Sequence, residues 1–236
     1  MEGPAFQLNE AGGYRFIPVE NRPFSASVLV DPGLDLVHAT FERPLPLERG
    51  IQAAVDAVRA SGRPVPALAG FELRIPEPFS GDGFVAFNEM YAGLLRAAGL
   101  EVDGHLPAGR TNVVPLAERI NEPSVYAFSY TAPGSRRDRA FLISGIPENT
   151  TGSLASRLDS IVHQLDGRLE EVGATWERVS AIQLYGDEEV GGAELTRILR
   201  RVGAHSIRWF PALPPIDTLT LEIDVRAAGA EVILES

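Results

Sequence analysis

The order of expected strands and helices occurs twice along the chain, and this duplication constrains the fold more than any other feature of the sequence. Apolar side chains alternate over the expected strands and recur every three or four positions over the expected helices. In the first half the strands are expected around 14–19, 25–30, 35–42, 66–75, 111–117 and 124–131, and the helices at 47–62 and 80–99. In the second half the strands are expected around 140–146, 178–186, 205–210 and 217–227, and the helices at 154–173 and 192–203. The pattern therefore predicts one sheet and two helices in each half of the chain.

The boundary between the halves is expected in "TAPGSRRD", which contains the turn residues Pro133 and Gly134. This gives an N-terminal domain at 1–132 and a C-terminal domain at 138–236. In a two-layer domain the helices cover one face of the sheet. A tandem fusion of this kind fixes a pairing that single domains reach by forming oligomers.

The stretch "TLTLEIDVRA" (218–227) alternates apolar and polar residues, as a half-buried strand does. Leu221, Ile223 and Val225 are expected to face the helices, which leaves Glu222 on the opposite face. That face meets either solvent, where Glu222 is an ordinary carboxylate, or a cleft, where Glu222 is placed for chemistry. Because a short connection favours a hairpin, we also expect the strands at 205–210 and 217–227 to pair as neighbours.

The composition excludes several kinds of chemistry. The chain contains no cysteine, and all 21 of its basic residues are arginine. Disulfides, thiolate nucleophiles and lysine Schiff bases are therefore impossible, which removes covalent pyridoxal phosphate attachment. The four histidines do not have the spacing of a metal site, so we expect no metal. The glycine-bearing helix starts "GGAEL" and "SGDGF" do not have the spacing of a dinucleotide or phosphate loop, and we expect no cofactor.

The charge and hydropathy patterns restrict the partners. A formal net charge of −11 argues against nucleic acid, because binding phosphates requires clustered positive charge. No apolar run approaches the length of about 18 residues that spans a bilayer. The N-terminal residues do not read as a secretion signal. The sequence therefore predicts a protein of the cytoplasm that binds neither membranes nor nucleic acids.

Several motifs together resemble the RidA (YjgF/YER057c/UK114) family of enamine and imine deaminases. They are "FLISGIP" (141–147), "EEVGATWERV" (170–179), the ending "GAHS…ALPPIDTLTLEIDVRA" (203–227), "GFVAFNEMY" (83–91) and "GRTNVVPLA" (109–117). The resemblance covers nearly the whole chain. It implies an α+β fold of two RidA-like (chorismate mutase-like) domains, each a mixed, mostly antiparallel sheet with two helices on one face.

The resemblance also implies a site. RidA-type domains form trimers with clefts between neighbours, where an arginine binds the substrate carboxylate and a glutamate orients water or moves a proton. Arg110 matches the arginine in the first half, and Glu222 matches the glutamate in the second. Ser144 and Gly145 match the Ser-Gly that lines the pocket. For this two-domain chain we expect a homotrimer with six domains.

Each half has lost one member of the arginine–glutamate pair. His205 stands at the arginine position of the second half, followed by Ser206, and Ala127 stands at the glutamate position of the first. His205 is a candidate acid or base and Ser206 a candidate substrate-binding residue. Because His205 shares strand parity with Ile207 and Trp209, a structural role for this histidine is the alternative.

Three functions remain open from the sequence. The first is a cofactor-free hydrolase or deaminase that acts on a small carboxylate-bearing enamine or imine, with water as nucleophile and Glu222 as acid or base. The second is a chorismatase-like lyase or hydrolase. The third is a non-catalytic small-molecule-binding or structural protein, which the divided arginine–glutamate pair favours. For Arg110 the alternative to carboxylate binding is a salt bridge at an interface.

Overall fold

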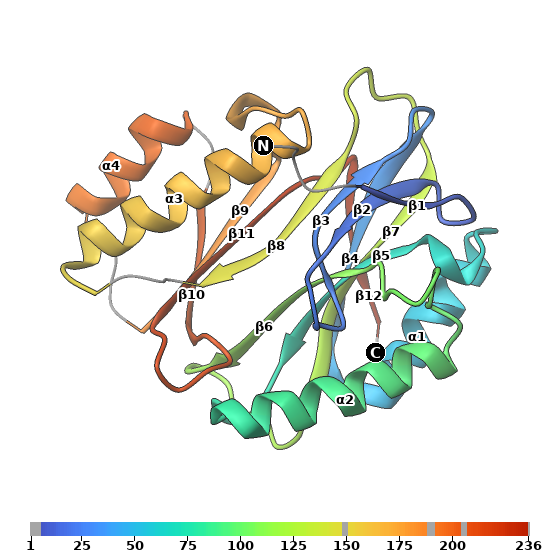
Figure 1. The fold of residues 1–236 in the computed structure, drawn as a ribbon, viewed down its shortest axis with the longest axis horizontal. Helices are drawn as coiled ribbons and strands as arrows, with labels where there is room; N and C mark the ends of the chain where they lie inside the picture. Colours follow the sequence, from blue (N-terminus) through green and yellow to red (C-terminus); the bar gives the residue numbers. More distant parts are fainter. Residues whose placement is uncertain (1–5, 148–150, 188–191, 204–206, 236) are drawn as a thin grey trace.

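The computed structural model describes residues 6–147, 151–187, 192–203 and 207–235 (Figure 1). The helices are α1 (Leu47–Ala60), α2 (Gly81–Ala97), α3 (Leu154–Glu171) and α4 (Gly192–Val202), with 3₁₀ turns η1 (Val65–Ala67) and η2 (Trp176–Arg178). The strands of the first half are β1 (Gln7–Asn9), β2 (Tyr14–Pro18), β3 (Ser25–Val30), β4 (Leu34–Pro46), β5 (Leu68–Arg74), β6 (Gly109–Pro115) and β7 (Ser124–Pro133). Those of the second half are β8 (Phe141–Pro147), β9 (Ala181–Gly186), β10 (Ile207–Leu213), β11 (Leu221–Ala227) and β12 (Ala230–Leu234).

The two halves have the same sheet topology. The strand order is β6-β5-β7-β4 in the first half and β10-β9-β11-β8 in the second. In each half the first two strands are parallel and the other pairs are antiparallel. Helices α1 and α2 lie on one side of the molecule and α3 and α4 on the opposite side, with the strands between them (Figure 1). The predicted fold class, two α+β domains with two helices on one face of a mixed sheet, is confirmed.

The two sheets are joined into one set of hydrogen-bonded strands. Strand β3 pairs with β8, and β10 pairs with β6. Strand β3 also meets β6 at the single pair Ser25 and Gly109, which closes a ring of six strands: β3, β8, β11, β9, β10 and β6. At its far end β12 pairs in parallel with β4, so a strand from the second half extends the sheet of the first. The faces of the two sheets that carry no helices therefore meet inside one chain.

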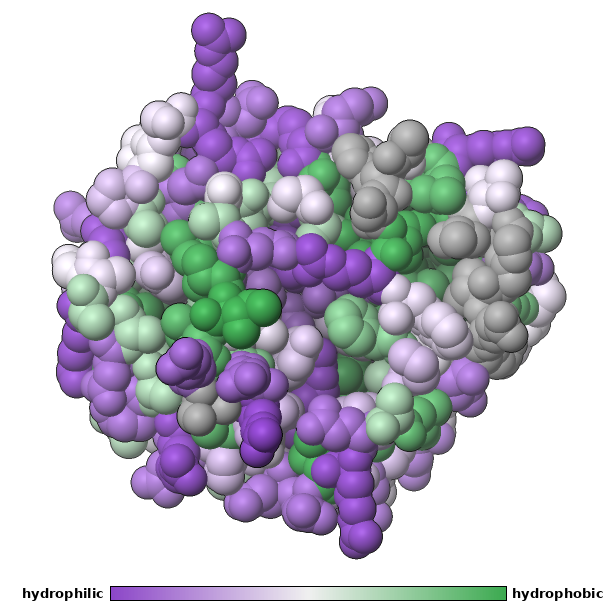
Figure 2. Space-filling view, turned by 180° about the vertical axis from the view of Figure 1, so that it is seen from behind, coloured by the Kyte–Doolittle hydropathy of each residue, from purple (hydrophilic) through white to green (hydrophobic). Residues whose placement is uncertain are grey.

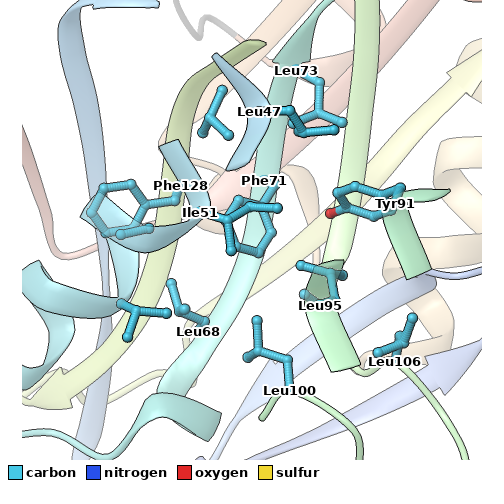
Figure 3. Close-up of a cluster of buried hydrophobic side chains, with 14 of the residues drawn as sticks. Leu47, Ile51, Leu68, Phe71, Leu73, Tyr91, Leu95, Leu100, Leu106 and Phe128 are labelled. Carbon is cyan, nitrogen blue, oxygen red and sulfur yellow. The ribbon is translucent and has the colours of Figure 1, made fainter. Parts of the chain in front are cut away.

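Each pair of helices covers its own apolar core. Figure 3 shows the core of the first half, in which labelled side chains from α1 and α2 converge on β5 and β7: Leu47, Ile51, Tyr91, Leu95, Phe71, Leu73 and Phe128. In the second core, Leu221, Ile223 and Val225 of β11 pack under α3 and α4, as their alternation predicts. Burial of one such side chain contributes about 1.5–3 kcal/mol to stability.

The expected hairpin between the strands at 205–210 and 217–227 is wrong. Strand β10 pairs with β9 and β6, whereas β11 lies between β8 and β9. The reason is the helical crossover: α4 connects β9 to β10 as parallel neighbours, so only the other edge of β9 is open to β11. The short strands β1 and β12 were not predicted from the sequence.

The surface is mainly polar. Figure 2 shows hydrophilic residues over much of the back of the molecule, with hydrophobic patches between them. Among the residues that the structure describes, no helix is both long and apolar enough to cross a membrane. Because the polar sheet faces already meet within one chain, their burial does not require a trimer. The homotrimer stays a prediction.

Candidate active site

The candidate site lies along one edge of β6, opposite the edge that pairs with β5. Strand β3 pairs with β6 only at Gly109, and β10 pairs with β6 only at Val114 and Pro115. Between these points the backbone N–H groups of β6 bind side chains from the second half. Ser144 Oγ accepts a hydrogen bond of 2.9 Å from the N–H of Arg110, and the Glu222 carboxylate accepts one from the N–H of Asn112. The gap is thus filled by groups from both halves of the chain.

Arg110 extends from β6 toward α2 and is only 4% exposed. Its guanidinium carbon lies over four aromatic rings, at 4.4 Å from the centre of Phe24, 5.0 Å from Tyr91, 5.5 Å from Phe84 and 5.6 Å from Phe87. Among the described residues Arg110 forms no salt bridge, and its Nη1 has no hydrogen-bond partner. Burial lowers the pKa of Arg110 to about 10, so the side chain remains charged at neutral pH. A buried cation without a counter-charge is costly unless a ligand supplies one.

Glu222 projects from β11 into the space between the sheets and is 3% exposed. It lies against Gly145, where a Cβ atom would overlap the carboxylate, so the absence of a side chain at this position makes room for Glu222. Burial and the nearby charge of Asp224 raise the pKa of Glu222 to about 8, although Arg110 and the N–H of Asn112 oppose the rise. Glu222 therefore holds a proton at neutral pH, as a general acid must.

Ser144 connects three strands. Besides accepting from Arg110, its hydroxyl donates a hydrogen bond of 2.5 Å to the carbonyl oxygen of Ser25. The structure thus brings together Arg110, Ser144, Gly145 and Glu222. The substrate-binding role of Ser144 and Gly145 stays a prediction. The other two candidates, His205 and Ser206, lie outside the described residues.

Two buried amides were missed in the sequence. Asn88 on α2 and Asn112 on β6 are 6% and 3% exposed, and neither side-chain amide has a hydrogen-bond partner within the described part of the chain. Both have a sequence signal. Asn88 is a polar residue on the apolar stripe of a helix, and Asn112 shares strand parity with Arg110. Buried polar groups are nearly always paired, so unpaired ones indicate a place for a polar ligand or water.

A second polar cluster fills the space between the two sheets. We call it the interior ion network; it consists of His38, Glu72, Arg74, Gln183, Tyr185, Asp224 and Arg226. Glu72 of β5 accepts hydrogen bonds from Gln183 at 2.7 Å and from Arg226 at 3.2 Å. Asp224 accepts from the Tyr185 hydroxyl at 3.1 Å and from Gln183 at 3.2 Å. Because these contacts run between β5 and strands of the second half, the network ties the two sheets together.

The charges in this network are balanced by their neighbours. Burial raises the pKa of Asp224 to about 7, with the charge of Glu72 adding to the effect and Arg226 opposing it. Burial lowers the pKa of His38 to about 4, so its imidazole is neutral and lies 3.0 Å from the Ser129 hydroxyl. A cavity of about 10 Å³ lies beside the network, which is room for no more than a water molecule. The network is packed as a structural element rather than as a binding pocket.

Comparisons with known proteins identify the family to which the chain belongs. The model of the CnbZ family, described as 2-aminomuconate deaminase, matches residues 6–162 and 148–232. The chain belongs to the CnbZ family. It is 33% identical to the 2-amino-5-chloromuconate deaminase of Comamonas testosteroni over 245 aligned residues, covering 94% of this chain and 96% of that protein. The family and the relative are both named for deamination of aminomuconates, in agreement with the deaminase that the sequence motifs led us to expect.

Solved structures show the fold. A chorismatase crystal structure matches 96% of this chain and 80% of its own chain, with a TM-score of 0.51 and 11% identity. A YjgF/YER057c/UK114 family member from Mycobacterium tuberculosis matches 42% of this chain and 82% of its own, with a TM-score of 0.32 and 17% identity. The chorismatase match extends over nearly the whole chain, and at this identity it shows a similar fold alone.

Proposed function

We propose that this protein is a cofactor-free deaminase that hydrolyses a carboxylate-bearing enamine of the 2-aminomuconate type. The observation that carries the proposal is the pairing of two unusual groups: Arg110 is a buried cation without a counter-charge, and Glu222 is a neighbouring carboxyl with a raised pKa. Each group influences the pKa of the other, so they lie within electrostatic reach. The family and the curated relative, both named for deamination of aminomuconates, support the same chemistry.

The reaction consumes one water and releases one ammonia. Protonation of a carbon of the enamine gives the imine, and water then adds to the imine carbon that carried the amino group. Proton transfer to nitrogen and cleavage of the carbon–nitrogen bond leave a 2-oxo acid and ammonia. Each step moves protons between substrate and one acid–base group, which contributes about 10²–10⁴-fold to the rate in typical enzymes.

The two groups divide the work. Arg110 binds the carboxylate next to the amino group, because a guanidinium matches a carboxylate through two parallel hydrogen bonds. This binding also places the reacting carbons beside Glu222. Glu222 donates its proton to the enamine and, as the carboxylate, takes a proton from the attacking water. The partial neutralisation of Arg110 by the substrate weakens its hold on the Glu222 anion, which favours the protonated acid.

Replacing Glu222 with Gln tests the proposal, because the amide keeps the size of the side chain but carries no exchangeable acid. We expect the wild type to release ammonia from 2-aminomuconate and Glu222→Gln to lower kcat by about 100-fold or more. Glu48→Gln, on the first turn of α1, is the control and keeps wild-type activity. Unchanged activity of Glu222→Gln would refute the role of Glu222. If the wild-type protein binds the substrate but releases no ammonia, the enzymatic proposal is refuted and the non-catalytic, small-molecule-binding function is supported.

A further inference from the structure

A second cation lies beside Arg110, on the loop between β2 and β3. This loop is closed by two backbone hydrogen bonds, from Val19 to the carbonyl of Phe24 and from Arg22 to the carbonyl of Val19. Asn21 adopts a positive φ of 56° in the turn. The loop covers Arg110 with the ring of Phe24 and carries Arg22 against the first turns of α2. One short loop therefore contributes both a cover for Arg110 and a further guanidinium.

Arg22 and Arg110 share one aromatic ring. The guanidinium carbon of Arg22 lies 5.4 Å from the centre of Phe84, and that of Arg110 lies 5.5 Å from the same centre. The two charges are therefore no farther apart than the sum of these distances. Their mutual repulsion is felt, because the charge of Arg22 lowers the pKa of Arg110. Two like charges held this close favour an anion between them.

Neither cation forms a salt bridge within the described part of the chain. Arg22 forms no salt bridge there, whereas Arg96, on the same groove, is paired with Glu101 at 2.6 Å. The groove itself has a volume of about 1040 Å³ and runs between the β2–β3 loop, α2 and the segment at 104–106. The unpartnered amide of Asn88, itself 94% buried, lines this groove. The groove therefore combines the guanidinium of Arg22 and the amide of Asn88 with two carboxylates, Glu20 and Glu89, and it borders the loop that covers Arg110.

We propose that Arg22 binds the second carboxylate of a dicarboxylate substrate whose first carboxylate is held by Arg110. The inference rests on the proposed function for the role of Arg110 and adds a residue that selects the substrate class. Because both guanidinium carbons lie within 5.5 Å of the centre of the Phe84 ring, one small diacid can contact both cations, one with each carboxylate. A monocarboxylate leaves Arg22 without a partner. The site therefore prefers a diacid by the value of one ion pair, and the loop that carries Arg22 closes over it.

Binding of two matched acids tests the inference. The probes are (E,E)-muconate and sorbate, which share a six-carbon diene and differ by one carboxylate. By isothermal titration calorimetry we expect the wild type to bind muconate about tenfold more tightly than sorbate or better, which corresponds to about 1.4 kcal/mol. Arg22→Ala should remove this preference by weakening muconate alone. Arg96→Ala is the matched control, because Arg96 lies on the same groove but already has a partner, and it should keep the preference.

A kinetic measurement separates this inference from the proposed function. Arg22→Ala should raise KM for 2-aminomuconate about tenfold and leave kcat, and the KM for the monocarboxylate 2-aminoacrylate, nearly unchanged. If the wild type releases no ammonia but keeps an Arg22-dependent preference for muconate, the proposed function fails and the diacid site stands. Equal binding of muconate and sorbate by the wild type overturns the diacid site, as does an equal loss in Arg22→Ala and Arg96→Ala. Absence of muconate binding overturns it too.

Discussion

The interior ion network and the surroundings of Arg110 are both buried and polar, but they treat charge in opposite ways. In the network Arg226 meets Glu72 at 3.2 Å, and it also meets Glu231 of β12 at 3.0 Å. Arg110 of β6, by contrast, lies over four aromatic rings and forms no salt bridge within the described part of the chain. A buried charge with a partner holds the fold together, whereas one without a partner is available to a ligand. The difference separates structural from functional charges in a molecule with many of both.

The aromatic rings explain how Arg110 is tolerated without a counter-charge. The face of each ring attracts a cation, and a desolvated contact of this kind contributes about 2 kcal/mol. This attraction offsets part of the cost of burial, and a substrate carboxylate supplies the rest. The arrangement keeps the guanidinium charged and preorganised before the substrate arrives.

The largest expected effect is on the paired side of the comparison. Arg226→Met removes the cation that faces Glu72 and Asp224 and leaves two buried acids beside each other. Breaking a buried ion pair from one side typically costs about 3–5 kcal/mol. We expect this loss in the free energy of unfolding measured with urea, with Arg59→Met on the exposed surface of α1 as the control. A change below about 1 kcal/mol would mean that the network contributes little to stability.

The next effect is the dependence of stability on pH. The pKa of Glu222 is raised from the ordinary 4.5 to about 8 in the folded protein. Between these values the folded state holds a proton that the unfolded state releases, so stability is highest below the lower value and falls as pH rises toward the upper one. The slope is at most about 1.4 kcal/mol per pH unit for one group. Asp224, with a pKa of about 7, acts in the same direction.

Glu222→Gln separates the contributions of Glu222 and Asp224 to this pH dependence. The variant keeps the contribution of Asp224 but loses that of Glu222, so its stability should fall less steeply between pH 5 and pH 8 than that of the wild type. Urea unfolding at several pH values measures both slopes. Parallel curves for the two proteins would show that Glu222 ionises normally in the folded state.

The smallest expected effect on stability is at the unpaired charge. Arg110→Met keeps the length of the side chain and removes a cation that has no counter-charge, so we expect a change in unfolding free energy within about 1 kcal/mol, or a gain. Calorimetry should show that muconate binding is lost in the same variant. A loss of stability as large as that of Arg226→Met would contradict the distinction between paired and unpaired charges.

The sequence predicted the parts of this molecule that depend on local pattern. The alternation in β11 correctly separated Leu221, Ile223 and Val225, which face the helices, from Glu222. The family motifs selected Arg110 and Glu222, which the structure brings into one region. Local pattern could not show that Glu72 and Arg226, 154 positions apart, would meet, because their contact depends on how the two sheets face each other.

The pairing of neighbouring strands was the other feature that the sequence could not predict. A short connection favoured a hairpin between β10 and β11, but the crossover through α4 assigned β10 to the opposite edge of β9. The sequence also could not show that Arg110 has no salt-bridge partner. A single arginine in a strand reads the same whether it ends in a salt bridge or in a ring of aromatic side chains, and only the packing of α2 and Phe24 decides between them.

The parallel pairing of β12 with β4 has a consequence for folding during synthesis on the ribosome. Residues 230–234 emerge after every other described strand, yet they cover an edge of the sheet that begins with residues 34–46. During synthesis, at about 5–20 residues per second, that edge waits uncovered while some 190 residues are added. An uncovered strand edge recruits other strands, so nascent chains are exposed to mispairing over this interval. The sheet of the N-terminal half therefore becomes complete only after the C-terminal half has been synthesised, so folding of the two halves is coupled.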